Sequence, residues 1–307
     1  MDRAASIAIL TYRRPLYLER ALASACAQRG DIREIMVVDN AADDRLGEWL
    51  SDSFPGVEYI PMPFNGGCEG RNAALRAAHA PVVIMIDDDV ELVGTDCALR
   101  ALDRFAETPD LACIDFRITD PQGRDLQRDW CHPRPIAEAS TGFETHFILE
   151  GACALRRESA LAAGGYPAEF FLGHEGVDLA YKLIGRGERI LYTPDIAVVH
   201  YAASDQRPAS RLYYYYTRNG IWIAYRHFPP FRAVGVALEN TARMAFFAIR
   251  AGQFRAHVRG WVAALRGIGQ IQRHPLNRTA QARLRTIRAH RPGFMSRVRR
   301  HLRERIQ

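Results

Sequence analysis

Residues 81–89 read Pro-Val-Val-Ile-Met-Ile-Asp-Asp-Asp, an apolar run that ends in three consecutive aspartates. A short run of Val, Ile and Met predicts a strand buried on both faces, as in a parallel sheet. Burying three unpaired carboxylates would cost several kcal/mol. We therefore expect Asp87, Asp88 and Asp89 to line a cleft, where a divalent cation or another positive group neutralises them. The alternative is a solvated acidic turn that caps the next helix.

Three further strand-like runs precede this stretch, at residues 6–10, 35–38 and 57–60, and helical patterns cover residues 14–28 and 70–80. Such alternation predicts a mostly parallel sheet with helices on both faces. Ligands of these sheets bind at the carboxyl ends of strands, near a switch in strand order. Thr11-Tyr12, Asp39-Asn40 and the aspartate triplet each follow a predicted strand, so we expect them to line one crevice. Residues 111–146 give weaker signals.

A glycine-rich loop opens the helix that precedes the triplet, with residues 65–72 reading Asn-Gly-Gly-Cys-Glu-Gly-Arg-Asn. The amino end of that helix, with Arg71, could receive phosphate oxygens. The alternative is a turn that only connects two elements. The loop matches neither nucleotide fingerprint, Gly-x-Gly-x-x-Gly or Gly-x-x-x-x-Gly-Lys, which argues against a dehydrogenase or a P-loop NTPase.

A second group of ionisable residues begins at His174. If a helix starts near Glu175, then Glu175 and Asp178 share one face near its positive end. The alternative is helix capping, with Asp178 paired to Lys182 four residues later. His200 ends the apolar run 196–199, where it could bind a metal or only form a hydrogen bond.

The chain is acidic up to residue 227 and basic afterwards. Its net charge is +6, yet residues 228–307 hold seventeen arginines against Glu239 and Glu304. This part is predicted to be helical, and residues 294, 298, 302 and 306 form an apolar stripe amid arginines. We expect that last helix to bind anionic lipid headgroups. The helices before it could instead pack on the part of the chain that precedes them. No nucleic-acid motif accompanies the arginines, so no nucleic acid is expected.

Composition is that of an ordinary globular protein, with 48% hydrophobic and 25% charged residues among 307. Six scattered cysteines without a Cys-x-x-Cys pair, and no signal peptide before the first strand, favour a reduced cytoplasmic protein. No stretch reaches about 18 uncharged apolar residues, so no transmembrane span is expected. The protein is expected in the cytoplasm, or peripherally on the inner face of the cell membrane.

In their order along the chain, these motifs resemble those of family 2 glycosyltransferases with the GT-A fold, over roughly residues 4–227. The motifs that carry the resemblance are Ile9-Leu10-Thr11-Tyr12-Arg13-Arg14-Pro15, Val37-Val38-Asp39-Asn40, Asn65-Gly66-Gly67 with Arg71-Asn72, Met85-Ile86-Asp87-Asp88-Asp89, Gly151-Ala152-Cys153, Gly165-Tyr166, Glu175-x-x-Asp178-Leu179 and His200-Tyr201.

The resemblance implies roles for residues in the crevice. Thr11 and Arg14 would border the nucleotide of a nucleoside-diphosphate sugar, and Asp39 would recognise its base. The diphosphate would lie near the loop. The residues implied there are Gly66 and Arg71 at the diphosphate, Asp87 and Asp88 at the donor, and Asp89 and His200 as ligands of Mn²⁺ or Mg²⁺.

One departure from the family pattern concerns the general base. The resemblance places an aspartate after Glu175, where this chain has Gly176. The acceptor hydroxyl has a pKa far above 7 and must lose its proton as it attacks, so a base is required. Glu175 or Asp178 could serve, and Glu175 is favoured because it adjoins the missing position. The alternative is that Gly176 marks a weakened or inactive enzyme.

The sequence thus predicts a metal-dependent inverting glycosyltransferase, with a GT-A catalytic domain at 1–227 and an Arg-rich helical region at 228–307. The expected donor is a UDP- or dTDP-sugar, because Asp39 suits uracil and thymine equally. The expected acceptor is a saccharide or lipid-linked saccharide in cell-surface polysaccharide or glycolipid synthesis. The alternatives are a sugar nucleotidyltransferase and a catalytically silent binder of nucleotide sugars.

Overall fold

The computed structural model describes residues 3–201 and 208–290. The chain divides into two compact units, one formed by Met1–Trp130 with Ser140–Gln206 and the other by Cys131–Ala139 with Arg207–Gln307. The predicted boundary after residue 227 differs from this division, because the helix α7 (Ala209–His227) belongs to the second unit.

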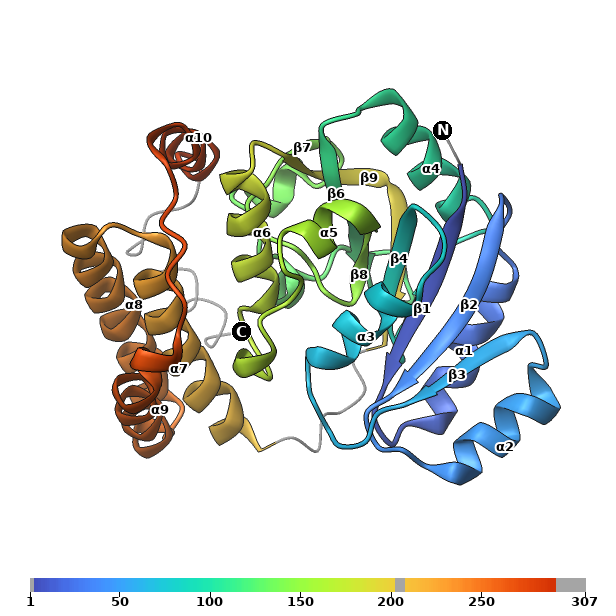
Figure 1. Cartoon of the computed structure of the whole chain (residues 1–307), viewed down its shortest axis with the longest axis horizontal. Coiled ribbons are helices and arrows are strands. Elements are labelled where there is room, and N and C mark those ends of the chain that lie inside the picture. Colours follow the sequence, from blue (N-terminus) through green and yellow to red (C-terminus); the bar gives the residue numbers. More distant parts are fainter. Residues whose placement is uncertain (1–2, 202–207, 291–307) are drawn as a thin grey trace. The chain divides into compact units, whose positions relative to one another are not determined.

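The first unit is a mixed β-sheet with helices on both faces (Figure 1). Its strands are β1 (Ala5–Thr11), β2 (Ile32–Asp39), β3 (Val57–Pro61), β4 (Val82–Asp87), β5 (Val90–Leu92), β6 (Leu111–Thr119), β7 (Phe143–Glu144), β8 (Ala152–Arg156) and β9 (Arg189–His200). Its helices are α1 (Pro15–Cys26), α2 (Asp44–Ser53), α3 (Glu69–Ala77), α4 (Cys97–Glu107), α5 (Arg157–Ala162) and α6 (Glu175–Gly185), with short 3₁₀ turns at Gln127–Asp129 and Ala168–Phe170.

The strand order is β3-β2-β1-β4-β8-β6-β9-β5, and β7 also pairs with β9. The predicted parallel pairing holds from β3 to β4, whereas β8 joins β4 and β6 in antiparallel fashion. The chain leaves β1 toward β2 and β3, then returns to place β4 on the other side of β1. This reversal of direction beside β1 is the switch point at which such sheets bind ligands.

Register brings the predicted strand ends to one edge of the sheet. Thr11 lies opposite Asp39 across β1 and β2, and Leu10 lies opposite Asp87 across β1 and β4. The expectation that these strand ends meet at one crevice is therefore correct.

Two apolar layers hold the sheet. Alternate residues of β1 and β4, such as Ile7 and Ile84, are buried against α1 and α4, and α2 packs at the edge of the same cluster. Residues that point the other way, such as Met36 and Met85, are also buried, on the face covered by α3, α5 and α6 (Figure 1). Burial on both faces explains why β4 reads as an uninterrupted apolar run.

The strand β6 was missed by the sequence analysis. Asp115 and Arg117 interrupt its apolar pattern, although Asp115 is fully buried and accepts a hydrogen bond from the Leu149 amide at 2.9 Å. In a hydrophobic pattern a buried carboxylate looks like an exposed polar position. The pattern of residues 111–119 therefore did not predict a strand.

The second unit is helical, as expected for the region after residue 227. Besides α7 it contains α8 (Pro230–Arg250), α9 (Phe254–Gly267) and α10 (Arg278–Arg288), with short turns at Ile136–Glu138 and Ile268–Gln270. The helices α7 and α9 cross closely, because a Cβ on Gly260 would lie 2.4 Å from the Tyr214 carbonyl oxygen. Trp222 Nε1 also donates to the Ala264 carbonyl at 3.0 Å.

Three sequence predictions concern membranes and thiols. Among the described residues, no helix is long and apolar enough to cross a membrane. The six cysteines, all of which lie in the described part, are free thiols. The amphipathic helix predicted at residues 292–307 lies outside the described residues.

Candidate functional site

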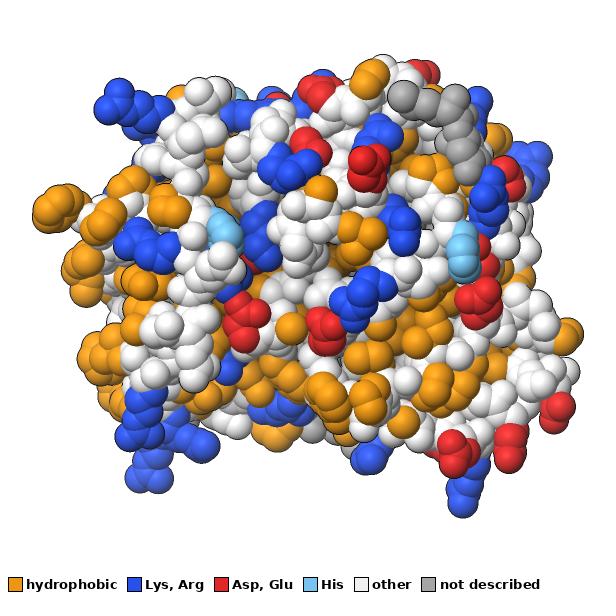
Figure 2. Space-filling view, in the orientation of Figure 1, with side chains coloured by type: hydrophobic (Ala, Val, Ile, Leu, Met, Phe, Trp, Pro, Cys, Tyr) orange, Lys and Arg blue, Asp and Glu red, His pale blue; other side chains and the backbone are white. Residues whose placement is uncertain are grey.

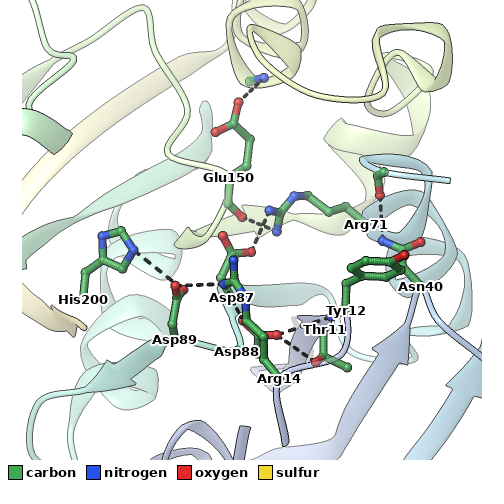
Figure 3. Close-up of polar contacts among 12 residues, drawn as sticks. Thr11, Tyr12, Arg14, Asn40, Arg71, Asp87, Asp88, Asp89, Glu150 and His200 are labelled. Atoms are coloured by element: carbon green, nitrogen blue, oxygen red, sulfur yellow. Dashed lines mark hydrogen bonds and ion pairs between the residues drawn. The ribbon is translucent and has the colours of Figure 1, made fainter. Parts of the chain in front are cut away.

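Asp88, which follows β4, forms hydrogen bonds with the end of β1 at the switch point (Figure 3). Its Oδ2 accepts hydrogen bonds from Thr11 Oγ1 at 2.8 Å and from the Tyr12 amide at 3.3 Å, while Arg14 Nη1 lies 3.2 Å from its Oδ1. Burial raises the pKa of Asp88 to about 6, against the opposing effects of Arg14 and Thr11. Both carboxylate oxygens are occupied within the protein, so Asp88 and Thr11 shape the crevice instead of presenting free groups to a donor.

Asp89 and His200 face each other at the same crevice (Figure 3). The antiparallel pairing of β5 with β9 places Val90 opposite His200, and His200 Nε2 lies 3.7 Å from Asp89 Oδ1. Arg14 Nη1 donates to the other oxygen of Asp89 at 3.0 Å. The sequence-predicted metal pair is thus brought together.

Asp129, which the sequence analysis did not single out, orients the imidazole. His200 Nδ1 lies 2.8 Å from Asp129 Oδ2, so Nε2 points at Asp89. Metal-binding histidines commonly use their second nitrogen in this way. Burial disfavours the charged imidazole, but the contacts with Asp129 and Asp89 outweigh it and raise the pKa of His200 to about 10. No local sequence signal distinguishes Asp129 from the other turn aspartates.

The residues present fit a hard divalent cation only in part. Asp89 Oδ1 and His200 Nε2 supply two ligands, and no group of three His, Cys, Asp or Glu side chains within the described ranges is arranged to hold a metal. Mg²⁺ and Mn²⁺ commonly take one or two protein carboxylates and complete their coordination with substrate phosphates and water. A cation here would take the place of the proton on His200 Nε2, which faces Asp89, and would depend on a phosphate-bearing substrate.

Arg71, which was predicted to lie near a phosphate, contacts Asp87 and the Glu150 carbonyl within the protein. The residue is 6% exposed, and its Nη2 donates to Asp87 Oδ1 at 2.7 Å while Nη1 donates to the Glu150 carbonyl oxygen at 2.9 Å. Arg71 therefore neutralises Asp87 from within the fold. Asp87 itself stays more than one third exposed, so a substrate can still reach it.

The glycine-rich loop likewise has its amide groups occupied. Asn40 holds it from both sides, because its Oδ1 accepts from the Gly66 amide at 3.3 Å and its Nδ2 donates to the Gly67 carbonyl at 3.0 Å. The Cys68 amide donates to the Phe171 carbonyl at 2.9 Å. These contacts are those of the connecting turn considered as the alternative, and the contact of Gly66 with a diphosphate stays a prediction.

Asp39 lies at the crevice edge but is fully buried. Its Oδ1 accepts from the Ala41 amide at 2.7 Å, and its Oδ2 accepts from the Asp43 amide at 2.8 Å and from the Tyr59 hydroxyl at 3.0 Å. These bonds fix the turn after β2. Recognition of a nucleotide base by Asp39 stays a prediction.

The two predicted bases, Glu175 and Asp178, both lie near the start of α6 but have different surroundings. Asp178 is fully buried and forms an ion pair with Lys182 at 2.9 Å, which is the pairing named in the capping alternative. Glu175 is 6% exposed, and its Oε2 is buried without a hydrogen-bond partner among the described residues. Burial raises the pKa of Glu175.

Glu150 is the carboxylate that the sequence analysis missed. It precedes β8, and its Oε1 accepts a hydrogen bond from the Gly176 amide at 2.6 Å (Figure 3). Burial, followed by repulsion from Glu175, raises the pKa of Glu150 to about 8. The signal that could have found it is the missing carboxylate at Gly176, which invites a search for a substitute elsewhere.

Carboxylates, a histidine and arginines thus meet at the switch point of a mixed α/β sheet, which is the arrangement of a GT-A glycosyltransferase. The model of the glycosyl transferase family 2 matches residues 6–165, more than half of the chain, and the protein belongs to that family. It is a glycosyltransferase.

Relatives and solved structures agree with this assignment. The N-acetylglucosaminyl-diphospho-decaprenol L-rhamnosyltransferase of Mycobacterium tuberculosis is 25% identical over 259 residues, which cover 72% of this chain and 84% of the relative. The fold is similar to that of the mannosyltransferase PcManGT from Pyrobaculum calidifontis, solved with GDP-Man and Mn²⁺, with a TM-score of 0.56, 18% identity and coverage of 97% and 86%. It is also similar to S. aureus TarS 1–349, with a TM-score of 0.56, 17% identity and coverage of 92% and 82%.

Proposed function

We propose that this protein is a metal-dependent inverting glycosyltransferase that moves a sugar from a nucleoside-diphosphate donor to a hydroxyl acceptor. The observation that carries the proposal is the Asp89–His200 pair, which lies beside Arg14 at the switch point of the sheet. The pair offers two ligands to a cation and leaves the remaining positions for phosphate oxygens. The solved relative that holds GDP-Man and Mn²⁺ supports the same chemistry.

The chain's own residues then divide the work. Asp89 and His200 would hold the cation, which when bound offsets the negative charge that grows on the departing diphosphate. Arg14 contributes a second positive charge at the crevice, and Asp129 keeps the imidazole of His200 in place. Asp87, half covered by Arg71, is left to accept hydrogen bonds from hydroxyl groups of the donor.

A lipid-linked saccharide is the acceptor we favour, in cell-surface polysaccharide or glycolipid synthesis. The mycobacterial relative transfers L-rhamnose to N-acetylglucosaminyl-diphospho-decaprenol, and the alignment covers most of both chains. The donor we favour is a UDP- or dTDP-sugar. We place the reaction in the cytoplasm, at the inner face of the cell membrane.

The second unit supports the membrane part of this proposal. One face of α8 exposes Phe231, Val234 and Leu238, and one face of α9 exposes Trp261 and Leu265. Arginines flank both helices, and Figure 2 shows hydrophobic side chains gathered over α8 with basic side chains nearby. Apolar faces beside arginines suit the interface of an anionic bilayer.

A donor screen tests the proposed function. The purified protein is mixed with UDP-, dTDP- and GDP-sugars, with Mn²⁺ or with EDTA, and with a GlcNAc-diphospho-polyprenol acceptor. We expect one nucleotide class to raise the unfolding temperature, because a ligand that binds only the folded state stabilises it. We also expect Mn²⁺-dependent transfer with inversion at the anomeric carbon, and loss of the Mn²⁺ effect in Asp89→Asn.

The same assay separates the alternatives. A sugar nucleotidyltransferase would release inorganic diphosphate from a nucleoside triphosphate and a sugar phosphate. A silent binder would be stabilised by one nucleotide sugar yet consume none of it, with either acceptor or water. Either of these results would contradict the proposed function.

A further inference from the structure

An inverting transfer needs a group that takes the acceptor's proton, and the carboxylates of the described residues near Arg71 and the start of α6 include Asp87, Asp178, Glu175 and Glu150. Asp87 already holds the Arg71 guanidinium at 2.7 Å. Asp178 is fully buried and paired with Lys182. Glu175 is buried, and its Oε2 has no hydrogen-bond partner within residues 3–201 and 208–290. The fourth carboxylate, Glu150, differs from Asp178 and Glu175 because it is partly exposed, and from Asp87 because it accepts from a backbone amide instead of holding a guanidinium.

Glu150 adjoins the crevice through its own backbone. Its carbonyl oxygen accepts from Arg71, whose other nitrogen holds Asp87, and the next carbonyl, of Gly151, accepts from the Asp87 amide at 3.2 Å. From there the side chain extends to the amino end of α6, as Figure 3 shows. The backbone of Glu150 thus lies beside the crevice, and its carboxylate lies at the first turn of α6.

Gly176 makes room for this carboxylate. A Cβ at position 176 would lie 2.6 Å from Glu150 Oε1 and 2.1 Å from the Ile148 carbonyl oxygen, closer than real atoms approach. The carboxyl group of Glu150 therefore fills the space in which any side chain at position 176 would begin. The amide of Gly176, near the positive end of the helix, also favours the anionic form of the base.

We propose that Glu150 is the general base of the transfer, an inference that rests on the proposed function. As the acceptor oxygen forms its bond to the anomeric carbon, its proton passes to the Glu150 carboxylate. The bond from the anomeric carbon to the diphosphate oxygen breaks at the same time, and the nucleoside diphosphate leaves with that electron pair. The proton later leaves Glu150 for water, which restores the base.

The electrostatic surroundings of Glu150 suit a base that works near neutral pH. Burial and the neighbouring Glu175 raise its pKa to about 8, and Arg71 opposes them. A base acts in its ionised form, so turnover should rise with pH until Glu150 is fully ionised. The ionisable groups that face Glu150 are Arg71 and Cys68 from α3 and its start, Glu175 from α6, Asp115 from β6 and Tyr166.

Three full-length variants test the assignment. Glu150→Gln keeps the size of the side chain and its acceptor for the Gly176 amide but cannot take a proton. Glu158→Gln makes the same change on the exposed surface of α5 and serves as the matched control. Glu175→Gln tests the competing base. For each variant, binding of UDP and dTDP with Mn²⁺ is measured by calorimetry, and donor consumption is measured between pH 5 and 9.

We expect Glu150→Gln to bind nucleotide like the wild type while its turnover falls about 10²-fold or more, the usual contribution of a general base. We also expect it to lose the rise of turnover with pH. Normal nucleotide binding with turnover within about threefold of the control, or an unchanged pH profile, would overturn the assignment of Glu150. A larger loss in Glu175→Gln than in Glu150→Gln would move the role to Glu175. Wild-type protein that binds neither nucleotide nor any nucleotide sugar would instead overturn the proposed function.

Discussion

At the residue scale, the site is built by mutual neutralisation of charges. Arg14 lies between Asp88 and Asp89, and Arg71 covers one side of Asp87. Burying so many charges without such partners would cost several kcal/mol for each ion. The two arginines therefore let three adjacent carboxylates share one crevice, and they leave more than one third of the Asp87 side chain exposed there.

Glu150 should also leave a mark on stability that needs no substrate. Its pKa is raised to about 8 in the folded protein, mainly by burial, from the usual 4.5 of a glutamate. The folded state then binds more protons than the unfolded state, so this group's contribution to stability falls as pH rises between those two values. Glu150→Gln cannot ionise and should escape that loss.

We therefore expect urea unfolding to show Glu150→Gln gaining stability relative to the wild type as pH increases from 5 to 8. Glu158→Gln, on the surface of α5, should track the wild type throughout. A difference between Glu150→Gln and the wild type that does not change with pH would show that Glu150 ionises normally in the folded protein.

At the element scale, short apolar strands and helix starts were readable from the chain, and charged contacts across it were not. The strands β1, β2, β3 and β4 appear where their runs of Ile, Val and Met predict, and the strand ends meet because parallel strands end at one edge. The partners of Arg71 and Glu150 come from segments distant in sequence, and no periodicity encodes them. The predictions for Gly66 and Arg71 did not anticipate their partners within the protein, whereas the pairing of Asp178 with Lys182, four residues apart, was foreseen as an alternative.

The first turn of α6 has no room for a side chain at Gly176. Replacing this glycine and an uncrowded helical glycine, Gly235, by alanine should therefore have opposite effects on stability. Gly176→Ala would push a methyl group against the Ile148 carbonyl, where backbone must move, so we expect a loss of about 1–3 kcal/mol in unfolding free energy. Gly235→Ala on α8 meets no atom within 4 Å and should stabilise by about 0.4–1 kcal/mol. Chemical denaturation of both variants checks this, and equal effects would contradict the crowding at residue 176.

At the scale of the whole molecule, the two compact units carry different kinds of surface. The first holds the charged crevice, and the second exposes apolar and arginine side chains on α8 and α9. The chain carries a net negative charge before residue 228 and a net positive charge after it, in agreement with these two kinds of surface. If the acceptor lies in a membrane, the apolar and arginine side chains of the second unit would bind that membrane.

Replacing two exposed apolar residues of α8 tests that role. Phe231 is 97% and Leu238 65% exposed, so the double variant Phe231→Ser, Leu238→Ser should unfold like the wild type but co-sediment several-fold less with phosphatidylglycerol-containing vesicles. Leu16→Ser, 80% exposed in the first unit, is the matched control. Binding should also weaken with added salt, because salt screens the arginines. Unchanged co-sedimentation of the double variant would rule out this face.

The contact between Glu150 and Gly176 has a consequence for how sequences are compared. A carboxyl group can change its place along the chain while keeping its place in space, provided that the residue it replaces loses its side chain. Alignments score each column separately and would count this protein as lacking a functional group. A comparison that asks whether any carboxyl group occupies the same place in the structure, whichever sequence position supplies it, would classify such chains by the chemistry they retain.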